Sequence, residues 1–482
     1  MLALNEAERA KLWKHLVYAI ETYTTGVQNA RVAPELDLTK VRELIRSFTF
    51  EVPRDPIEAI NFVLQGLWQQ QVHTPHPRYF GLFNPAATTM GIAADMLVAA
   101  FNPQLAAWSH APFAAEIEVH LVRKFGECFG YDSSAIDGTF TSGGAEANHT
   151  AILTALVEAF PDFPRKGLRG LHGQPRLYVS EQTHHSILKA ARFCGLGTDA
   201  VQKVGVNERR QMDPMLLASQ IVEDRAAGFL PFLVIATAGS TNAGTIDPLV
   251  PIADVAAKQN LWLHVDAAWG GAAMLVPELR PLLAGIERAD SITFDTHKQL
   301  SVPMAAGLYL TRHPDVLGRT CTIAADYMPR DARDLDIVDP FVHSLQWSRR
   351  FIGLKVFMSL AVAGWQGYEN ALRHQTAMGE RLRTELIASR WKIINDTKLP
   401  VVCFVDEQKK GEGSSAYVNS IAQMVISSGR AWISTTQLGN TSVLRACITN
   451  YRTRPDDIAA LVEALNTARQ QVATRAPAPV SA

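Results

Sequence analysis

The 482-residue chain has few cysteines, no long hydrophobic run and no excess of charge of either sign. Its five cysteines lie far apart and form no Cys-x-x-Cys pair, which excludes a disulfide framework and a clustered zinc site. No apolar segment is long enough to cross a bilayer, and the charged start of the chain does not resemble a secretory signal. We therefore expect a soluble cytoplasmic protein with reduced thiols and no membrane association.

The charge balance also argues against nucleic acid as a partner. The 46 lysines and arginines are matched by 47 aspartates and glutamates, a net charge of −1, whereas nucleic-acid-binding chains are usually basic. The 14 histidines form no His-Glu-x-x-His motif, and the adjacent His184 and His185 point to different faces of regular structure, so no metal site is expected. With 47% hydrophobic residues the chain can bury a large core, and its length predicts two or three packed units.

The pattern of helical and extended segments divides the chain into three parts. Residues 1–90 contain helix-like stretches between proline-rich connectors, which predicts an N-terminal helical arm. Residues 91–345 alternate short apolar runs with helical stretches, which predicts a large α/β domain around a mostly parallel sheet. Residues 346–482 are expected to hold a linker helix, starting near residue 345, and a small α+β domain.

Candidate functional residues follow the predicted strands, where ligands of such sheets bind. A Ser-Gly-Gly turn at 142–144 leads into an apolar helix, whose free backbone N–H groups can hold a phosphate. Asp266 ends one predicted strand, and His297 and Lys298 follow the next. Taken singly, these groups are equally typical of a helix cap, a strand-end cap and a solvated lysine.

Taken together, these groups match the three anchors of pyridoxal phosphate. A lysine forms the Schiff base, a carboxylate keeps the pyridine nitrogen protonated so that the ring accepts electrons, and a helix start holds the phosphate. His184, in a segment that follows another predicted strand, can stack on the ring. The combination therefore predicts an enzyme that uses this cofactor.

Seven collinear segments resemble the group II pyridoxal-phosphate-dependent amino-acid decarboxylases, the family of aromatic-amino-acid, histidine and glutamate decarboxylases. The segments are residues 76–85, 142–148, 180–191, 263–271, 294–298, 348–355 and 444–453. The resemblance implies the aspartate-aminotransferase-type fold (fold type I), with a large cofactor domain and a small C-terminal domain. It also implies a homodimer with shared active sites.

The resemblance further implies a role for individual residues. Lys298 matches the Schiff-base lysine, Asp266 the partner of the pyridine nitrogen, and His184 the histidine that stacks on the ring. The other cofactor contacts that it implies are Gly143, Gly144 and Ala145 at the phosphate, His297 near the phosphate, Ala268 against the ring, and Ser240 or Thr241 at a cofactor oxygen. Many relatives carry a hydroxyl at the position of Ala145, so Thr141, Ser142 or backbone groups must replace that contact.

A second departure concerns the proton donor. Eukaryotic aromatic decarboxylases resemble one another in a loop tyrosine that returns a proton to the substrate carbon. Counting back from Arg349 and Arg350 places Pro340 to Phe341 at that position, and phenylalanine has no proton to donate. Tyr327, His184 or a water is the alternative donor.

The leading prediction is decarboxylation of an L-amino acid to the amine and carbon dioxide. The assignment of Phe341 keeps open a rival reaction, in which decarboxylation is coupled to oxidative deamination and the product is an aldehyde. An aminotransferase is a further alternative, with Arg445 holding the α-carboxylate, although Arg445 is favoured as a structural residue. A cofactor-binding protein without a reaction is disfavoured because Lys298, Asp266 and His184 are all present.

The substrate stays open between two chemical classes. Phe80, Phe83 and Trp108 fit the floor of an aromatic pocket, and they fit core packing equally well. Arg78 fits an acidic substrate side chain, and it fits an acidic neighbour within the protein equally well.

Overall fold

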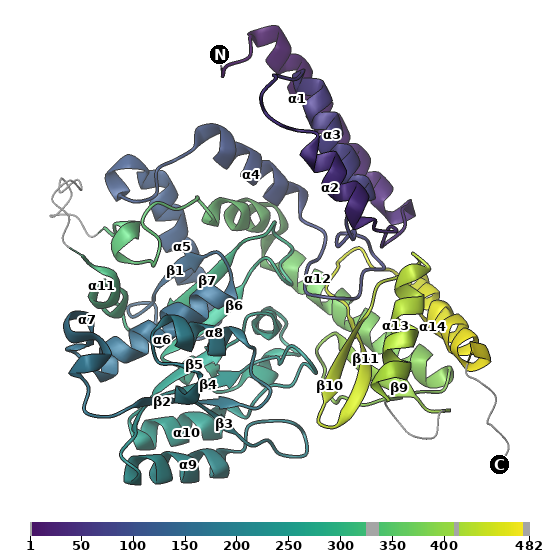
Figure 1. The fold of residues 1–482 in the computed structure, drawn as a ribbon. Helices are drawn as coiled ribbons and strands as arrows, with labels where there is room; N and C mark the ends of the chain where they lie inside the picture. Colours follow the sequence, from purple (N-terminus) through teal and green to yellow (C-terminus); the bar gives the residue numbers. More distant parts are fainter. Residues whose placement is uncertain (1, 324–336, 409–413, 476–482) are drawn as a thin grey trace, which may run out of the picture. The chain divides into compact units, whose positions relative to one another are not determined.

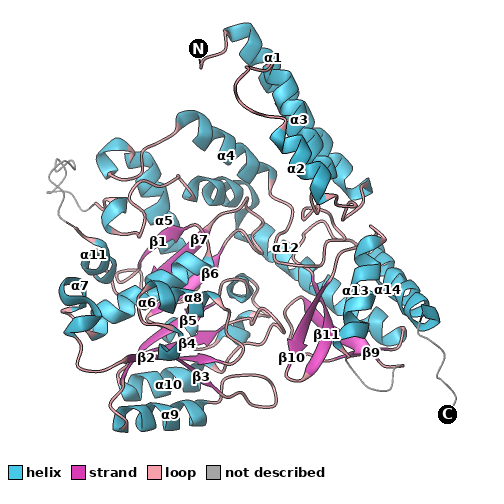
Figure 2. Cartoon of the chain, viewed as in Figure 1, coloured by secondary structure: helices cyan, strands magenta, loops and turns pink. Residues whose placement is uncertain are grey.

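The computed structural model describes residues 2–323, 337–408 and 414–475 (Figures 1 and 2). The chain forms two compact units. One contains residues 1–86, 378–394 and 402–482, and the other contains residues 87–377 and 395–401. The domain boundaries expected from the sequence, at residues 90 and 345, stay a prediction.

The larger unit is built on a seven-stranded sheet with the order β1-β7-β6-β5-β4-β2-β3. Neighbouring strands run parallel except around β7, which is antiparallel to both of its neighbours. The mostly parallel sheet confirms the predicted α/β class. The strands are β1 Asp137–Thr141, β2 Pro175–Ser180, β3 Val201–Val204, β4 Leu230–Thr237, β5 Trp262–Asp266, β6 Ser291–Asp295 and β7 Gly307–Thr311.

Helices cover both faces of this sheet. On β6, the hydroxyl of Thr293 bonds to Asn148 of α6, whereas the ring of the next residue, Phe294, contacts Phe125 of α5 and Phe129. Successive strand residues face opposite sides, so α6 and α5 lie on opposite faces. Among these helices, α9 Pro214–Ala226 and α10 Leu249–Gln259 pack side by side (Figure 1). The others, besides short helical turns, are α4 Thr89–Phe101, α5 Pro112–Cys128, α6 Gly144–Ala159, α8 Ser186–Phe193 and α11 Val316–Cys321.

Strand register brings several strand ends to one edge of the sheet. Gly307, at the start of β7, pairs with Thr141 at the end of β1 and with Asp295 at the end of β6. Asp266, at the end of β5, pairs with Thr293 of β6 and with Thr237 of β4. The residues that follow these strands therefore meet at the same edge, where α6 begins.

The long helix α12 begins later than the sequence indicates. It spans Gly353–Ala388, with non-helical backbone at Gly364, so the prediction of a helix from about residue 345 is wrong for its first turns. Arg349 forms a buried ion pair with Glu118 of α5, and the N–H of Gly353 donates to the same carboxylate. These contacts hold residues 349–353 against α5, and the helix starts only after them.

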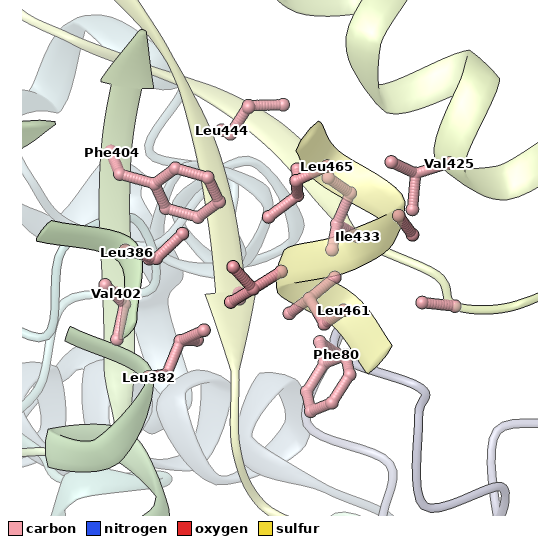
Figure 3. Packing of buried hydrophobic residues seen from close by; sticks show 14 of the residues in the cluster. Phe80, Leu382, Leu386, Val402, Phe404, Val425, Ile433, Leu444, Leu461 and Leu465 are labelled. Atoms are coloured by element: carbon pink, nitrogen blue, oxygen red, sulfur yellow. The ribbon is translucent and has the colours of Figure 1, made fainter. Parts of the chain in front are cut away.

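The smaller unit combines the N-terminal segment with the C-terminal part of the chain. Its sheet has the order β10-β11-β9-β8, and its core contains side chains from both segments (Figure 3). Phe80 lies in this core, and its backbone bonds to Trp432 and Cys447. The elements are α1 Glu6–Gly26, α2 Leu38–Arg46, α3 Pro56–Gln69, β8 Trp391–Ile393, β9 Val401–Asp406, α13 Ser415–Ser427, β10 Ser434–Leu438, β11 Thr441–Cys447 and α14 Pro455–Arg475.

Candidate active site

Asp266 is a buried carboxylate with both oxygens hydrogen-bonded. It ends β5 and is 6% exposed. Asn148 of α6 donates its amide to Oδ2 at 2.9 Å, and the backbone N–H of Ala268 donates to Oδ1 at 3.2 Å. Because both donors are neutral, they stabilise the ionised carboxylate without cancelling its charge.

A buried polar network orients Asn148. Its Oδ1 accepts a hydrogen bond from the Thr293 hydroxyl at 2.9 Å and lies 3.1 Å from Nε2 of His264. The other ring nitrogen of His264 lies 2.8 Å from the Ser291 hydroxyl. Burial lowers the pKa of His264 to about 4, so the imidazole is neutral and donates from Nε2. With its oxygen so occupied, Asn148 must point its NH₂ group at Asp266.

Lys298 follows the next strand, β6, and contacts a second buried carboxylate. Its Nζ is 2.9 Å from Oδ2 of Asp295, the last residue of β6, which is 2% exposed. Asp295 is not among the site residues predicted from the sequence. The available signal was its position three residues before Lys298 at the end of the same predicted strand.

The first turn of α6 forms a narrow cradle beside this pair. A side chain at Gly144 would place its Cβ 2.8 Å from Oδ2 of Asp295, so only glycine fits there. Gly143 has φ of 152°, which also favours glycine, and Ala145 follows in the helix. The first N–H groups of a helix have no partner within it, so they are available to an anion.

The side chains expected to replace the missing hydroxyl at Ala145 are engaged within the loop. Thr141 donates its hydroxyl to the carbonyl of Gly143 at 3.1 Å. Ser142 donates both its N–H and its hydroxyl to Glu146. Backbone N–H groups are therefore the donors that the loop offers to an anion.

Two histidines border the same edge. The Cε1 atom of His297 would lie 3.4 Å from a Cβ on Gly143, and burial lowers the pKa of His297, so a neutral ring adjoins the cradle. His184 follows β2, and its Nδ1 accepts a hydrogen bond from the N–H of Ser186 at 3.2 Å. The Ser186 hydroxyl in turn accepts from Asn148 at 3.0 Å, which links His184 to the network around Asp266.

Three further predicted cofactor residues lie in turns at this edge. Ala268 is buried, and its Cβ lies 3.4 Å from the position of a Cβ on Gly144. Ser240 follows β4 and is buried, with its Oγ accepting from the N–H of Thr245 at 3.1 Å. Thr241 is the next residue in this turn.

The structure describes one of the two loop residues considered at the proton-donor step and not the other. Phe341 is 9% exposed, its N–H donates to the carbonyl of Ala106, and its ring lies 4.8 Å from that of Trp347. Tyr327 lies outside the described residues. The roles assigned to both stay predictions.

Two arginines considered for substrate binding have partners within the smaller unit. Arg78 forms an ion pair with Asp457, at 3.0 Å between Nε and Oδ1. Arg445 is buried, and its Nη1 donates to the carbonyl of Gly81 and to the Ser434 hydroxyl. These contacts favour the structural interpretation of both residues.

The residues at the sheet edge fit pyridoxal phosphate. Lys298 supplies an amine, Asp266 supplies a fixed carboxylate, and the glycines of α6 leave room at a helix start for a phosphate. Asp295 has one carboxylate oxygen, Oδ1, without a hydrogen-bond partner among the described residues. Over the same residues no group of three histidines, cysteines or acidic residues lies close enough together to hold a metal ion, and no helix is long and apolar enough to cross a membrane.

Comparisons with known proteins agree with this chemistry. The family model described as the pyridoxal-dependent decarboxylase conserved domain matches residues 48–406. The aromatic-L-amino-acid decarboxylase of Bacillus atrophaeus is 28% identical over 481 residues, covering 99% of this chain and 98% of the relative. Both results confirm the family resemblance predicted from the sequence.

Solved structures share the fold over nearly the whole chain. The crystal structure of mouse CSAD matches with a TM-score of 0.90 and 26% identity, covering 96% of this chain and 99% of that one. The crystal structure of Rhodiola rosea 4-hydroxyphenylacetaldehyde synthase matches with a TM-score of 0.87 and 24% identity, covering 97% and 99%. The protein therefore belongs to the pyridoxal-dependent decarboxylases, a family of carboxy-lyases whose cofactor is pyridoxal phosphate.

Proposed function

We propose that the protein decarboxylates an L-amino acid to the amine and carbon dioxide. The observation that carries this proposal is the placement of Asp266, Lys298 and the start of α6 at one edge of the sheet. When bound, pyridoxal phosphate supplies an aldehyde and an electron-accepting ring. Lys298 would bind the aldehyde, Asp266 would hold a proton on the ring nitrogen, and His184 would cover the ring.

The remaining cofactor contacts follow from the same placement. Backbone N–H groups of Gly143, Gly144 and Ala145 would hold the phosphate, with His297 beside it. Ala268 would pack against the ring, and Ser240 or Thr241 would contact a ring oxygen. Each of these residues lies at or near the carboxyl ends of β1, β4, β5 or β6.

Aromatic amino acids are the substrates that we propose first. The relative from Bacillus atrophaeus is named for aromatic substrates. The acidic alternative was motivated by Arg78, and the carboxylate of Asp457 already pairs with that arginine. A screen of L-amino acids for carbon dioxide release tests this choice, and release from glutamate or aspartate alone would contradict it.

The cofactor assignment has a direct chemical test. Purified protein with pyridoxal phosphate should show a visible absorbance band, and borohydride should fix the cofactor covalently to Lys298. Lys298→Ala should lose the band and the label, whereas Lys203→Ala, which removes an exposed lysine of β3, should keep both. A labelled peptide that does not contain Lys298 would overturn the assignment.

A second candidate function is decarboxylation coupled to oxidative deamination. The observation that favours it is Phe341, which counting from Arg349 places where relatives carry a tyrosine. Without a phenol there, protonation of the substrate carbon is slow and oxygen can intercept the reaction. The Rhodiola rosea enzyme is named as an aldehyde synthase, and its likeness to this chain extends to the fold alone.

Product analysis separates these two reactions. Wild type and Phe341→Tyr are compared in air and without oxygen, with amine, aldehyde and hydrogen peroxide measured. General acid catalysis is worth about 10²–10⁴-fold, so the tyrosine variant should shift product toward amine. Phe113→Tyr, at an exposed position, is the control. If wild type already forms only amine and the variant changes nothing, Phe341 is not at the reacting carbon.

We also propose that the protein is a homodimer. None of the residues of α1, α2 or α3 is buried, although α3 is rich in apolar side chains. Ile45 is 61% exposed and Leu67 is 47% exposed, and both line one apolar groove. A second copy of the chain would cover this surface.

Light scattering after size exclusion tests the dimer. Wild type should have twice the mass of the chain, and the Ile45→Asp and Leu67→Asp double variant should dissociate at low concentration. A control substitution at the exposed Glu21, to glutamine, should leave the mass unchanged. A monomeric wild type would contradict the proposal.

A further inference from the structure

Asp295 is a buried acid, and among the described residues the one lysine or arginine that forms an ion pair with it is Lys298. Its Oδ2 lies 2.9 Å from Nζ of Lys298, and its Oδ1 has no hydrogen-bond partner among the described residues. Burying a carboxylate without full hydrogen bonding is costly, and such a group is expected where a function requires it.

The carboxylate lies in the corner where the phosphate is proposed to bind. A Cβ on Gly144 would lie 2.8 Å from Oδ2, and a Cβ on Gly307 would lie 2.7 Å from Oδ1. The carboxylate therefore sits directly against the backbone of the first turn of α6 and the start of β7. A negatively charged phosphate at this helix start would have the carboxylate as a close neighbour.

The surrounding ionisable groups leave Lys298 as the charge that balances Asp295. Nε2 of His297 is 4.0 Å from Oδ2, and burial keeps that ring neutral. Among the described residues, Asp266 of β5, His184 and His185 are further titratable groups near this edge. Lys355 of α12, which also acts on His297, pairs with Asp95. Glu146, in the first turn of α6, accepts a hydrogen bond from Ser142.

Cofactor capture changes the charge of that one partner. An amine reacts with an aldehyde only as the neutral base, so Nζ of Lys298 must first lose a proton. Once it does, an ionised Asp295 would face an anionic phosphate with no adjacent cation. If the proton moves from Lys298 to Asp295, the amine becomes neutral and the acid no longer faces the phosphate as an anion.

We propose that Asp295 accepts the proton that Lys298 releases during cofactor capture. The proton moves along the 2.9 Å contact from Nζ to Oδ2, and the Nζ lone pair becomes available to the aldehyde carbon. As the carbon–nitrogen bond forms, the aldehyde oxygen leaves as water with the two remaining Nζ hydrogens. The neutral carboxyl group would then place no negative charge beside the phosphate. No electrons are transferred, and Lys298 releases no free proton to the solvent, because its other two hydrogens leave within the water molecule.

Calorimetry counts the protons exchanged with solvent. Pyridoxal phosphate is titrated into cofactor-free protein near neutral pH, in phosphate-free buffers that differ in ionisation enthalpy. Asp295→Asn keeps the shape of the side chain and cannot accept the proton, so it should release about one more proton per site than wild type. The cofactor's own ionisation is common to both proteins and cancels in this difference. Asp162→Asn, which removes a surface carboxylate, should match wild type.

Two further measurements protect the test against a variant that folds poorly. In wild type alone, the rate of cofactor capture should be nearly independent of pH between about 6.5 and 8.5, because the lysine loses its proton internally. A rate that rises about tenfold per pH unit would overturn the proposal. On the Lys298→Ala background Asp295 must take its proton from solvent, so that variant should take up about one proton more than the double variant with Asp295→Asn.

The inference rests on the proposed function for the identity of Lys298, and the two can fail separately. Equal proton counts for wild type and Asp295→Asn, with borohydride label on Lys298, would overturn the role of Asp295 and leave the proposed function intact. A label on another residue would overturn both.

Discussion

Two buried carboxylates end neighbouring strands of the same sheet, and their surroundings differ. Asp266 of β5 accepts hydrogen bonds from neutral donors at both oxygens. Asp295 of β6 has a lysine at one oxygen and no partner among the described residues at the other. Neutral donors stabilise a carboxylate without exchanging protons with it, so they fit an acid that must stay charged throughout a reaction. A lysine that loses its charge on reacting leaves its carboxylate partner unbalanced, so it fits an acid whose charge changes as well.

The packing behind each acid agrees with this difference. Asp266 is supported by Asn148, whose orientation depends on His264 and Thr293. Satisfied buried networks of this kind are rigid. Asp295 instead lies against the backbone of Gly144 and Gly307, where there is no room for another side chain. The sheet edge thus combines a fixed charge with one that depends on Lys298.

The largest effect is expected at the fixed charge. Asp266→Asn should lower turnover by roughly 10²–10³-fold, because a neutral partner no longer keeps the ring nitrogen protonated. Cofactor binding should persist, since the phosphate cradle and Lys298 are unchanged. Steady-state kinetics and the visible absorbance band measure the two properties. Asp295→Asn in the same assays is the matched comparison, and near-normal turnover of Asp266→Asn would remove the proposed distinction between the two acids.

A smaller effect is expected where the network orients Asp266. Asn148→Ala leaves Oδ2 of Asp266 without its amide donor, whereas Nε2 of His264 keeps the Thr293 hydroxyl at 3.2 Å, and an unsatisfied buried group costs about 1–3 kcal/mol. Urea unfolding should show a loss of this size, accompanied by reduced turnover. Asn370→Ala, at an exposed position of α12, is the control. An unfolding free energy equal to that of wild type would indicate that water replaces the amide.

The sequence predicted one of these acids and not the other, for a physical reason. Asp266 ends a strongly apolar run, so its place at the ligand edge follows from strand periodicity and residue type. Asp295 ends an equally clear strand, but its importance depends on the close approach of Gly144 and Gly307, which come from distant segments. Such approaches depend on tertiary packing and leave no local pattern.

The start of α12 and the loop around Phe341 show the same limit. Helical periodicity extends back to about residue 345, yet the buried pair of Arg349 and Glu118 holds the chain away from helical geometry until Gly353. Counting residues back from Arg349 assigns Phe341 to a sequence position, and it does not say where that side chain lies relative to the reacting carbon. The role of Phe341 is therefore left to product analysis.

The smallest effect at neutral pH is expected from His264, which supports the charged Asp266 only indirectly, through Asn148. The pKa of His264 is lowered to about 4 from 6.5, so the folded protein binds fewer protons than the unfolded chain between these values. Its contribution to stability is therefore complete above pH 6.5 and is lost as the pH falls toward 4, by at most about 1.4 kcal/mol per pH unit.

His264→Gln should change the unfolding free energy little at pH 7.5 and should flatten its fall between pH 6.5 and 5. Urea unfolding at several pH values measures this, with the exposed His172→Gln as control. The pKa of His76 is lowered to about 4 as well, so wild type and variant should both retain part of the acid sensitivity. If the variant and wild type lose stability with the same slope, His264 takes up a proton in the fold as readily as in the unfolded chain, and it is protonated at the lower end of this pH range. Asp266 would then be supported by a cation, and its contrast with Asp295 would disappear.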